Sequence, residues 1–229
     1  MKTNPVITVD GPSGSGKGTL SQLLAKKLQW HLLDSGALYR VLALAAEKHA
    51  IAWDNYDALE ALAEHLDVRF EENEGKPIKI ILEGEEVTSE IRTESCGMKA
   101  SIVASIPGVR QALLARQRTF RQAPGLIADG RDMGTVVFPD ADFKVFLEAS
   151  HEIRAKRRWA ELQQRGLDVS LESLLEEIKV RDVRDRQRAI SPLVPAEDAY
   201  ILDTSQLGIH EVYDQVMQKL EKEGILAYL

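Results

Sequence analysis

Short apolar runs alternate with amphipathic stretches along much of the chain. An apolar run at residues 5–10 is followed by leucines at helical spacing over residues 20–28. The same order of strand, turn and helix recurs at residues 30–34 and 41–49. This alternation predicts an α/β fold in which a parallel sheet core is flanked by crossover helices.

The alternation is interrupted in the middle of the chain, after a short amphipathic helix at 57–66. Apolar and polar residues then follow the pattern of antiparallel strands joined by polar turns. These stretches are residues 68–71, 78–83 and 86–88, with a polar turn at 73–76. We therefore expect a single domain over 1–229, assembled from both ends of the chain around a small inserted antiparallel β/helical subdomain at about 63–105.

The second half of the chain returns to the alternating pattern. Helices are predicted at 95–105, 107–122, 171–189 and 209–223, and strands at 125–129, 143–148 and 200–203. Ser150 and Ser170 stand where N-caps are expected, each directly before a charged helical stretch. These elements continue the sheet that the first strand begins.

A glycine-rich loop joins the first predicted strand to the first predicted helix. It consists of Gly11, Pro12, Ser13, Gly14, Ser15, Gly16, Lys17, Gly18 and Thr19. In such a loop the backbone N–H groups converge on an anion at the helix N-terminus, and the lysine adds a charge for the outer phosphates. Gly18 stands where most such loops carry the Ser or Thr that holds magnesium. We therefore expect ATP binding, with a metal geometry unlike that of a switch GTPase.

Composition narrows the class of protein. A chain of 229 residues that is 44% hydrophobic can bury one sizeable core and a small insert. A single cysteine excludes an internal disulfide. No apolar run is long enough to cross a membrane, and residues 1–4 are too short for a signal peptide. We expect a cytoplasmic, soluble protein with no membrane partner, and the lack of an obvious apolar stripe favours a monomer.

The net charge of −7 argues against nucleic-acid binding, but it is unevenly spread. Residues 151–188 carry ten Lys and Arg against eight Asp and Glu, whereas the remainder carries 19 against 28. A locally basic segment in an acidic chain indicates a focused anion site.

Arginines are the candidate catalytic groups. Arg181, Asp185 and Arg188 share one helix face because they are four and seven residues apart. A solvated ion pair is the alternative interpretation. However, an acceptor that is itself a phosphate needs no general base, and it needs cations to offset repulsion between two anions. The candidate arginines are Arg40, Arg131, Arg157, Arg158, Arg181 and Arg188.

Two aspartates, Asp34 and Asp129, lie at the carboxyl ends of predicted strands, where ligands bind in open α/β sheets. Asp129 is the better candidate for ordering Mg²⁺ through water, although a capping or turn-forming role is equally plausible for either. The five histidines have no ligand spacing and are expected in the core or on the surface, and Cys96 is expected to be a buried, inert thiol.

Three further stretches complete a resemblance to the bacterial cytidylate kinases. They are residues 34–40, 129–135 and the helix over 181–188. Gly-Lys-Gly-Thr at 16–19 is similar to nucleoside monophosphate kinases broadly, whereas Asp-Gly-Arg-Asp-Met-Gly-Thr at 129–135 resembles this branch in particular. The resemblance implies an adenylate-kinase-like fold with a lid at about 154–168. It also implies transfer of the γ-phosphoryl group of ATP to CMP or dCMP with Mg²⁺.

The same resemblance implies roles for individual residues. Ser35, Arg40, Arg131 and Arg188 would surround the acceptor nucleotide and its phosphate, Arg181 and Asp185 would contact its sugar, and Ser101, Arg110 and Asp132 would read its base. Lys17, Arg131, Arg158 and Arg188 are the residues expected to stabilise the transferred group.

The chemistry of cytosine supports this assignment of the base-reading residues independently. Cytosine offers an amino donor beside two acceptors. Asp132 can accept from the amino group, and Arg110 can donate to the acceptors. Uracil would place a carbonyl oxygen against the carboxylate.

Other functions remain open. The acceptor could be another monophosphate such as UMP or AMP, whereas an alcohol acceptor would want a general base and fewer arginines. A nucleotide-dependent switch or assembly protein is a different class, disfavoured by Gly18 and by the lack of a guanine-reading motif.

Overall fold

The computed structural model describes residues 4–73, 76–164 and 166–225, which form two compact units. The first unit combines Met1–Asp34 with Arg118–Leu229, and the second is Ser35–Gln117. The predicted insert at about 63–105 lies inside the second unit, which extends beyond it on both sides. Residues 1–3, 74–75, 165 and 226–229 lie outside the described residues, and with them part of the expected polar turn at 73–76 and one residue of the expected lid.

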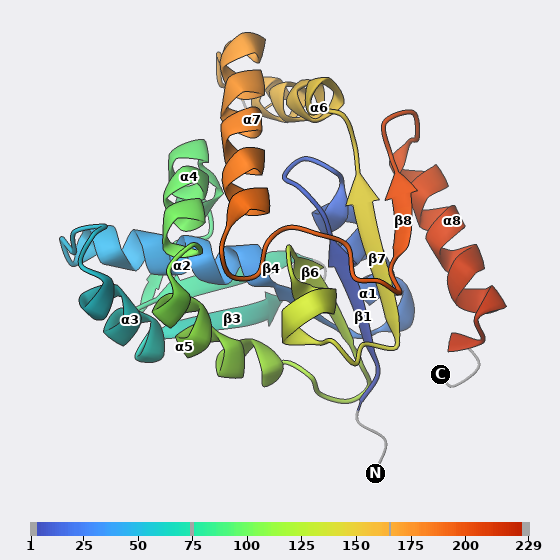
Figure 1. Ribbon diagram of the computed structural model, residues 1–229, viewed down its shortest axis with the longest axis horizontal. Helices are drawn as coiled ribbons and strands as arrows, with labels where there is room; N and C mark the ends of the chain where they lie inside the picture. The colour runs from blue at the N-terminus through green and yellow to red at the C-terminus, as the bar shows by residue number, and fades with distance from the viewer. Residues whose placement is uncertain (1–3, 74–75, 165, 226–229) are drawn as a thin grey trace. The chain divides into compact units, whose positions relative to one another are not determined.

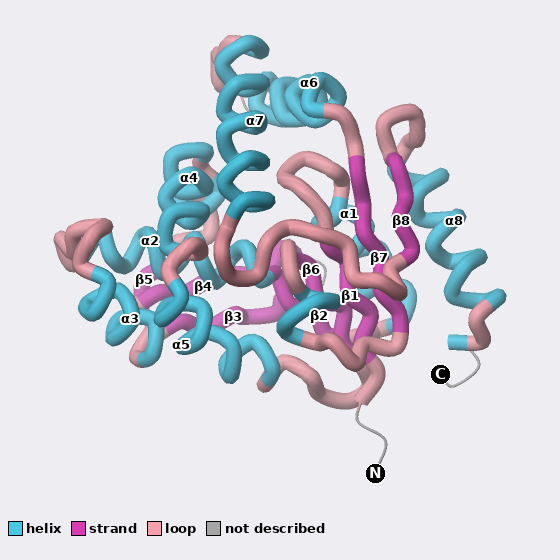
Figure 2. Tube along the Cα trace, in the orientation of Figure 1, coloured by secondary structure: helices cyan, strands magenta, loops and turns pink. Residues whose placement is uncertain are grey.

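The first unit is built on a five-stranded sheet with the strand order β2-β6-β1-β7-β8 (Figures 1 and 2). The strands are β1 (Val6–Asp10), β2 (His31–Asp34), β6 (Leu126–Gly130), β7 (Phe143–Glu148) and β8 (Tyr200–Asp203). All four pairings are parallel, and β1 is buried along its whole length. The predicted parallel α/β fold is therefore confirmed.

Two helices, α1 (Lys17–Leu28) and α8 (Ile209–Lys222), pack against this sheet and share its apolar core. Two further helices, α6 (His151–Gln164) and α7 (Leu171–Gln187), pack against each other. Leu20 and Leu24 of α1 and Val216 of α8 are fully buried in one apolar cluster with the strands. Their helical spacing explains why these segments pack as amphipathic helices against a sheet whose strands are apolar on both faces.

The second unit contains the helices α2 (Ser35–Lys48), α3 (Tyr56–Glu64), α4 (Glu94–Val103) and α5 (Pro107–Arg118), with a 3₁₀ turn η1 (Glu90–Arg92). It also holds the antiparallel strands β3 (Val68–Asn73), β4 (Lys76–Leu82) and β5 (Glu85–Glu86), in that order. Alternate strand positions such as Ile80 and Leu82 join a second apolar cluster with Leu42 and Leu59. The antiparallel insert is thus present, and it has its own core.

Local hydrogen bonds explain where elements begin and end. The strand expected at 86–88 stops at Glu86 because the side chain of Thr88, not its backbone, accepts the Ile80 N–H at 3.0 Å. Ser150 and Ser170 accept the N–H groups three residues onward at 3.3 Å each, which confirms both predicted N-caps. The helix expected to reach 189 ends at Gln187, since the Leu193 N–H turns back to the Asp185 carbonyl at 2.8 Å.

Two findings complete the fold. A short π-helical turn, η2 (Met133–Val137), follows β6, where the sequence predicted no helix. Among the described residues, no helix combines the length and the apolar composition that a membrane crossing requires.

Candidate active site

The glycine loop between β1 and α1 depends on backbone that only glycine tolerates. Gly11 has φ +147°, and a Cβ there would lie 2.3 Å from the carbonyl oxygen of Leu147. Gly16, the residue before α1, has φ +97°. A side chain at either position would strain the turn, so the two glycines fix the path by which β1 enters the helix.

The loop closes on the carbonyl oxygen of Pro12. This oxygen accepts hydrogen bonds from the Ser15 N–H at 3.4 Å, the Ser15 hydroxyl at 3.0 Å and the Lys17 ammonium at 3.0 Å. Lys17 is buried, and it lies at the first position of α1. The lysine is therefore already held inside the loop, where the helix N-terminus adds to its attraction for an anion.

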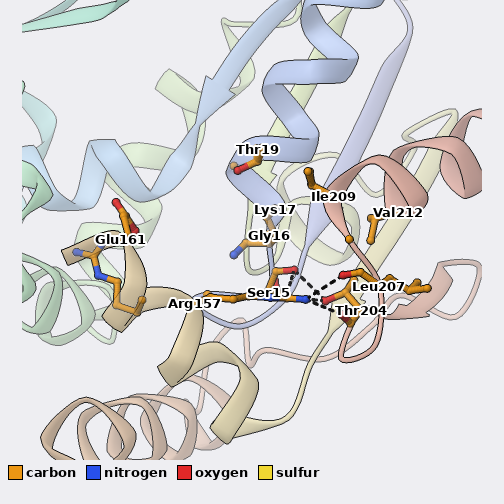
Figure 3. A pocket seen from close by; sticks show the side chains of 14 residues that line it. Ser15, Gly16, Lys17, Thr19, Arg157, Glu161, Thr204, Leu207, Ile209 and Val212 are labelled. Atoms are coloured by element: carbon orange, nitrogen blue, oxygen red, sulfur yellow. Dashed lines mark hydrogen bonds and ion pairs between the residues drawn. The ribbon is translucent and has the colours of Figure 1, made fainter. Parts of the chain in front are cut away.

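A cavity of about 530 Å³ adjoins the loop (Figure 3). One wall of the cavity is the loop itself. The opposite wall is formed by residues of α6 and of the segment after β8. They are Arg157, Arg158, Glu161, Thr204, Leu207, Gly208, Ile209 and Val212. One side of the cavity is thus rich in cations and backbone N–H groups and the other is apolar, which suits a ligand with a polyphosphate and a flat ring.

Arg157 connects the glycine loop to the segment after β8 through hydrogen bonds. Its guanidinium donates to the hydroxyl of Thr204 at 3.0 Å, to the carbonyl of Thr204 at 2.5 Å and to the carbonyl of Ser15 at 3.4 Å (Figure 3). Arg158, one residue on, donates to Glu161 at 2.6 Å. Sequence reasoning missed Thr204 and the apolar residues after it, because no local motif marks a segment that joins the loop only in the folded chain.

Arg154 differs from its neighbours on α6. It is the first residue of the expected lid at about 154–168, but its side chain is only 2% exposed. It donates to the carbonyl of Ser13 at 2.9 Å and to both carboxylate oxygens of Asp182 at 3.1 and 2.5 Å. Arg154 therefore braces the loop against α7, and the arginines of α6 that line the cavity are Arg157 and Arg158.

Titratable groups gather behind the loop. Burial raises the pKa of Asp129 to about 6, although the Lys17 charge opposes this. Burial, reinforced by the Arg131 charge, lowers the pKa of Lys17 to about 7. Burial raises the pKa of Asp10 to about 7, against the opposing effect of backbone N–H groups. Desolvation of the charged forms is thus the largest cause of all three pKa shifts, and such shifts are common at functional sites.

These shifts predict how stability depends on pH. Asp10 and Asp129 hold protons in the folded state that they release in the unfolded state, where their pKa is near 3.8. Their contribution to the free energy of unfolding is therefore present at low pH and is lost as pH rises towards about 7, by up to about 1.4 kcal/mol per pH unit for each group. Urea unfolding of the wild type and of Asp129→Asn between about pH 5 and pH 7 measures this, and the variant should show the shallower decline. A wild-type stability that rises across this interval would contradict the assignment.

Asp129 also fits the chemistry of Mg²⁺. A Cβ added at Gly18 would lie 3.5 Å from the Asp129 carboxylate, so this carboxylate faces the loop directly. Its oxygens are hard ligands, and Mg²⁺ commonly keeps several waters and binds to phosphates together with one or two carboxylates. In residues 4–73, 76–164 and 166–225, no three His, Cys, Asp or Glu side chains cluster as a metal site. The residues present thus fit an ion that arrives with a nucleotide.

A second group of charges surrounds Asp185 of α7. The Arg131 guanidinium donates to the Asp185 carboxylate at 3.0 Å, and Arg188 donates to the carbonyl of Ser191 at 2.7 Å. Burial by itself raises the pKa of Asp185, but Arg131, Arg181 and Arg188 together hold it below its usual value. Three guanidinium groups therefore converge on one buried carboxylate, and the sequence had named all four residues.

Arg181 connects the charges around Asp185 to the glycine loop between β1 and α1. Its guanidinium lies 3.4 Å from the hydroxyl of Ser13. Asp132, next to Arg131, is buried at the start of η2. The acceptor residues that the sequence assigned to the first unit thus lie on α7 and on the segment after β6.

The other four predicted acceptor residues belong to the second unit. Arg40 donates to the carbonyls of Ile91 and Thr93 at 2.7 and 2.9 Å, and the Ser35 hydroxyl donates to Gln117 at 2.6 Å. Arg110 donates to the carbonyl of Ala104 at 3.0 Å, and its guanidinium carbon lies 5.4 Å from the centroid of the Tyr39 ring. Ser35, Ser101 and Arg110 are buried.

The cysteine offers no reactive group. The Cys96 thiol is buried and donates to the carbonyl of Arg40 at 3.4 Å, and burial raises its pKa. A thiol in this state is a poor nucleophile, in agreement with the sequence expectation.

The sequence of this chain is similar to those of known proteins. The family model "Cytidylate kinase" matches residues 7–222. A cytidylate kinase of Salmonella arizonae is 59% identical over 223 residues, covering 97% of this chain and 98% of its own. A cytidylate kinase of Shewanella denitrificans is also 59% identical, over 95% of this chain and 96% of its own. A solved shikimate kinase of Acinetobacter baumannii, in complex with shikimate, covers 96% of this chain and 94% of its own at 17% identity and a TM-score of 0.42. With its family match and its relatives spanning nearly the whole sequence, the chain belongs to the cytidylate kinase family.

Proposed function

We propose that this chain transfers the γ-phosphoryl group of ATP in line to CMP and dCMP, giving CDP and dCDP. Membership of the cytidylate kinase family supports phosphorylation of CMP by ATP. The observation that carries the proposal is the buried Lys17 inside a glycine loop, beside a cavity with one cationic and one apolar wall. That arrangement suits a nucleoside triphosphate better than a small anion.

On the donor side, the loop residues bind the phosphates through backbone N–H groups, and Lys17 binds the outer phosphates. Its present bond to the Pro12 carbonyl is replaced by phosphate contacts, and the carbonyl stays satisfied because it still accepts from the Ser15 N–H and hydroxyl. Arg158 is the residue of the cavity wall proposed to reach the transferred group. Mg²⁺, when bound, neutralises charge on the ATP phosphates, and Asp129 would hold it through water.

On the acceptor side, Arg131 and Arg188 bind the monophosphate, and Arg181 and Asp185 bind the sugar. The support for this is the convergence of three guanidinium groups around Asp185 in a buried setting. Such groups cancel the repulsion between two phosphates and stabilise charge spread over the transferred group. Ser35 and Arg40 of the second unit complete the proposed set.

Ser101, Arg110 and Asp132 are proposed to read the base. Asp132→Ala should lower the ratio of kcat/KM for CMP over UMP by about 10²-fold, because the carboxylate that accepts from the cytosine amino group and repels the uracil oxygen is removed. Steady-state kinetics with both acceptors at saturating ATP measure the ratio. Asp140→Ala is the matched control, since Asp140 is exposed and paired with Arg121. An unchanged ratio in Asp132→Ala would show that another group selects the base.

Three further parts of the proposal concern the whole protein. The segment at about 154–168 serves as a lid that excludes water from the phosphates. We also propose that the protein is monomeric and works in the cytoplasm.

ADP formation from ATP tests the proposal most directly. It should be fast with CMP or dCMP and slow with UMP, AMP or no acceptor. Fast turnover with UMP or AMP instead would make the chain a kinase of another monophosphate. Slow hydrolysis that ignores every acceptor would identify a nucleotide switch and reject the proposal.

A further inference from the structure

Asp10 is a buried carboxylate to which the proposed reaction assigns no role. It is the last residue of β1 and is 5% exposed. One carboxylate oxygen accepts the Met133 N–H at 2.9 Å, and the other accepts the Gly134 N–H at 2.8 Å. Both oxygens thus accept from backbone N–H groups that follow far later in the sequence, and these hydrogen bonds are charge-assisted once Asp10 ionises, above its pKa of about 7.

Those two N–H groups open the π-helical turn η2. The first N–H groups of any helical turn have no partner within the turn, so they must be satisfied from outside. Asp10 does this at the start of η2. At its other end, Arg118 donates to the carbonyls of Val136 and Val137 at 3.1 and 3.0 Å. Side chains from distant parts of the chain therefore hold both ends of the turn.

Asp10 also fixes the residue before this segment. Its backbone pairs with Gly130 of β6 in the parallel sheet. The chain from Gly130 to Met133 is thus held at one end by the backbone of Asp10 and at the other by its carboxylate. The residues between these two anchors are Arg131 and Asp132.

The backbone of Asp10 is itself held in place on both sides. Asp10 pairs on its other side with Phe146 of β7, and it is followed directly by Gly11, the first residue of the phosphate loop. Gly11 lies so close to the carbonyl of Leu147 that even a Cβ would not fit. One residue therefore links the position of the phosphate loop to that of the segment carrying Arg131 and Asp132.

We infer that Asp10 is a positioning residue for acceptor recognition, which sets the choice of base by holding Arg131 and Asp132 in a fixed direction relative to the phosphate loop. The inference rests on the proposed function, because it takes Asp132 to read the base. Asp10 touches neither nucleotide in this role and acts through the two residues that it clamps.

Asp10→Asn tests the inference with little change of shape. An asparagine offers one acceptor oxygen, and its amino group would face the second N–H, so one of the two bonds at Met133 and Gly134 must break. The ratio of kcat/KM for CMP over UMP should fall about tenfold, while KM for ATP changes by less than about threefold. A merely structural role would lower the melting temperature and leave the ratio unchanged.

Asp142 provides the matched control, because its carboxylate binds the opposite end of β1. Its carboxylate accepts the Val6 N–H at 2.8 Å, a bond of the same kind. Asp142→Ala should lower stability and leave both the ratio and KM for ATP unchanged. A shift of the ratio in this variant equal to that in Asp10→Asn would overturn the inference, since any weakening of β1 would then suffice.

The Asp132→Ala variant separates the inference from the function on which it rests. A shifted ratio in Asp132→Ala with an unchanged ratio in Asp10→Asn rejects the role of Asp10 alone. An unchanged ratio in Asp132→Ala rejects base reading by Asp132, and the role of Asp10 with it. Should Asp10→Asn not fold, amide hydrogen exchange of the wild type decides. The Met133 and Gly134 amides should exchange slowly, and exchange at the rate of exposed loop amides would overturn the inference.

Discussion

Lys17→Met should reduce turnover of CMP about 10²- to 10³-fold without destabilising the protein. The ammonium group is the charge proposed to stabilise the outer phosphates, and the loss of one such preorganised group typically costs this much in rate. Without nucleotide, however, the buried charge of Lys17 lowers the stability of the folded state, as the lowering of its pKa to about 7 by burial indicates. A methionine of similar shape removes that desolvation cost, so the melting temperature should stay the same or rise.

Lys144→Met is the control that makes this result specific. Lys144 is as buried as Lys17, and it also donates to a proline carbonyl five residues earlier, that of Pro139, at 2.7 Å. Its second partner is Asp198, at 2.9 Å. Since Lys144 lies on β7 and not at the loop, its loss should lower the melting temperature and change kcat by less than about threefold. Equal kinetic losses in the two variants would show that removing any buried lysine lowers the rate as much as removing the loop charge, and the proposed role of Lys17 would be wrong.

Arg188→Ala should lower kcat/KM for CMP about 10²- to 10³-fold. Arg188 is one of the three guanidinium groups that hold the pKa of Asp185 down, and it is buried at the end of α7. Its loss removes a cation from the proposed acceptor phosphate and weakens the charge balance around a buried carboxylate, so both KM for CMP and kcat should suffer. KM for ATP, measured at saturating CMP, should change little.

The matched control for this variant is Arg186→Ala. Arg186 lies on the same last turn of α7 but is about half exposed, and its pair with Glu148 is long, at 3.9 Å. An exposed pair of this kind contributes little, so the kinetics should remain close to those of the wild type. If Arg188→Ala behaved like Arg186→Ala, the acceptor site would have to lie elsewhere.

Much of the fold follows from local pattern. The strand at Val6–Asp10 and the glycine loop after it were predictable, because apolar runs and glycine spacing act over a few residues. Element ends were less predictable. The end of β5 depends on the side chain of Thr88 and the end of α7 on the N–H of Leu193, and both are tertiary hydrogen bonds that no local pattern encodes.

The candidate site divides in the same way. Helical spacing was enough to place Arg181 and Asp185 on one face of α7, since an offset of four returns to the same side of a helix. Arg188 instead lies just past the end of the helix at Gln187. It did not reveal that Arg154 is buried as a brace, because a run of arginines has the same pattern whether it faces solvent or a carboxylate. The π-helical turn at Met133–Val137 escaped prediction too, since its end groups are satisfied by Asp10 and Arg118.

The sequence by itself determined the α/β class, the glycine-rich loop and the set of arginines proposed to bind two phosphates, because these properties depend on periodicity and short spacings. Only the tertiary structure decided which charges are buried, which arginines line the cavity and which hold the framework, and how one aspartate joins the loop to the segment after β6. Those outcomes depend on desolvation and on hydrogen bonds between residues far apart in the chain, and burial turns identical side chains into different chemical groups.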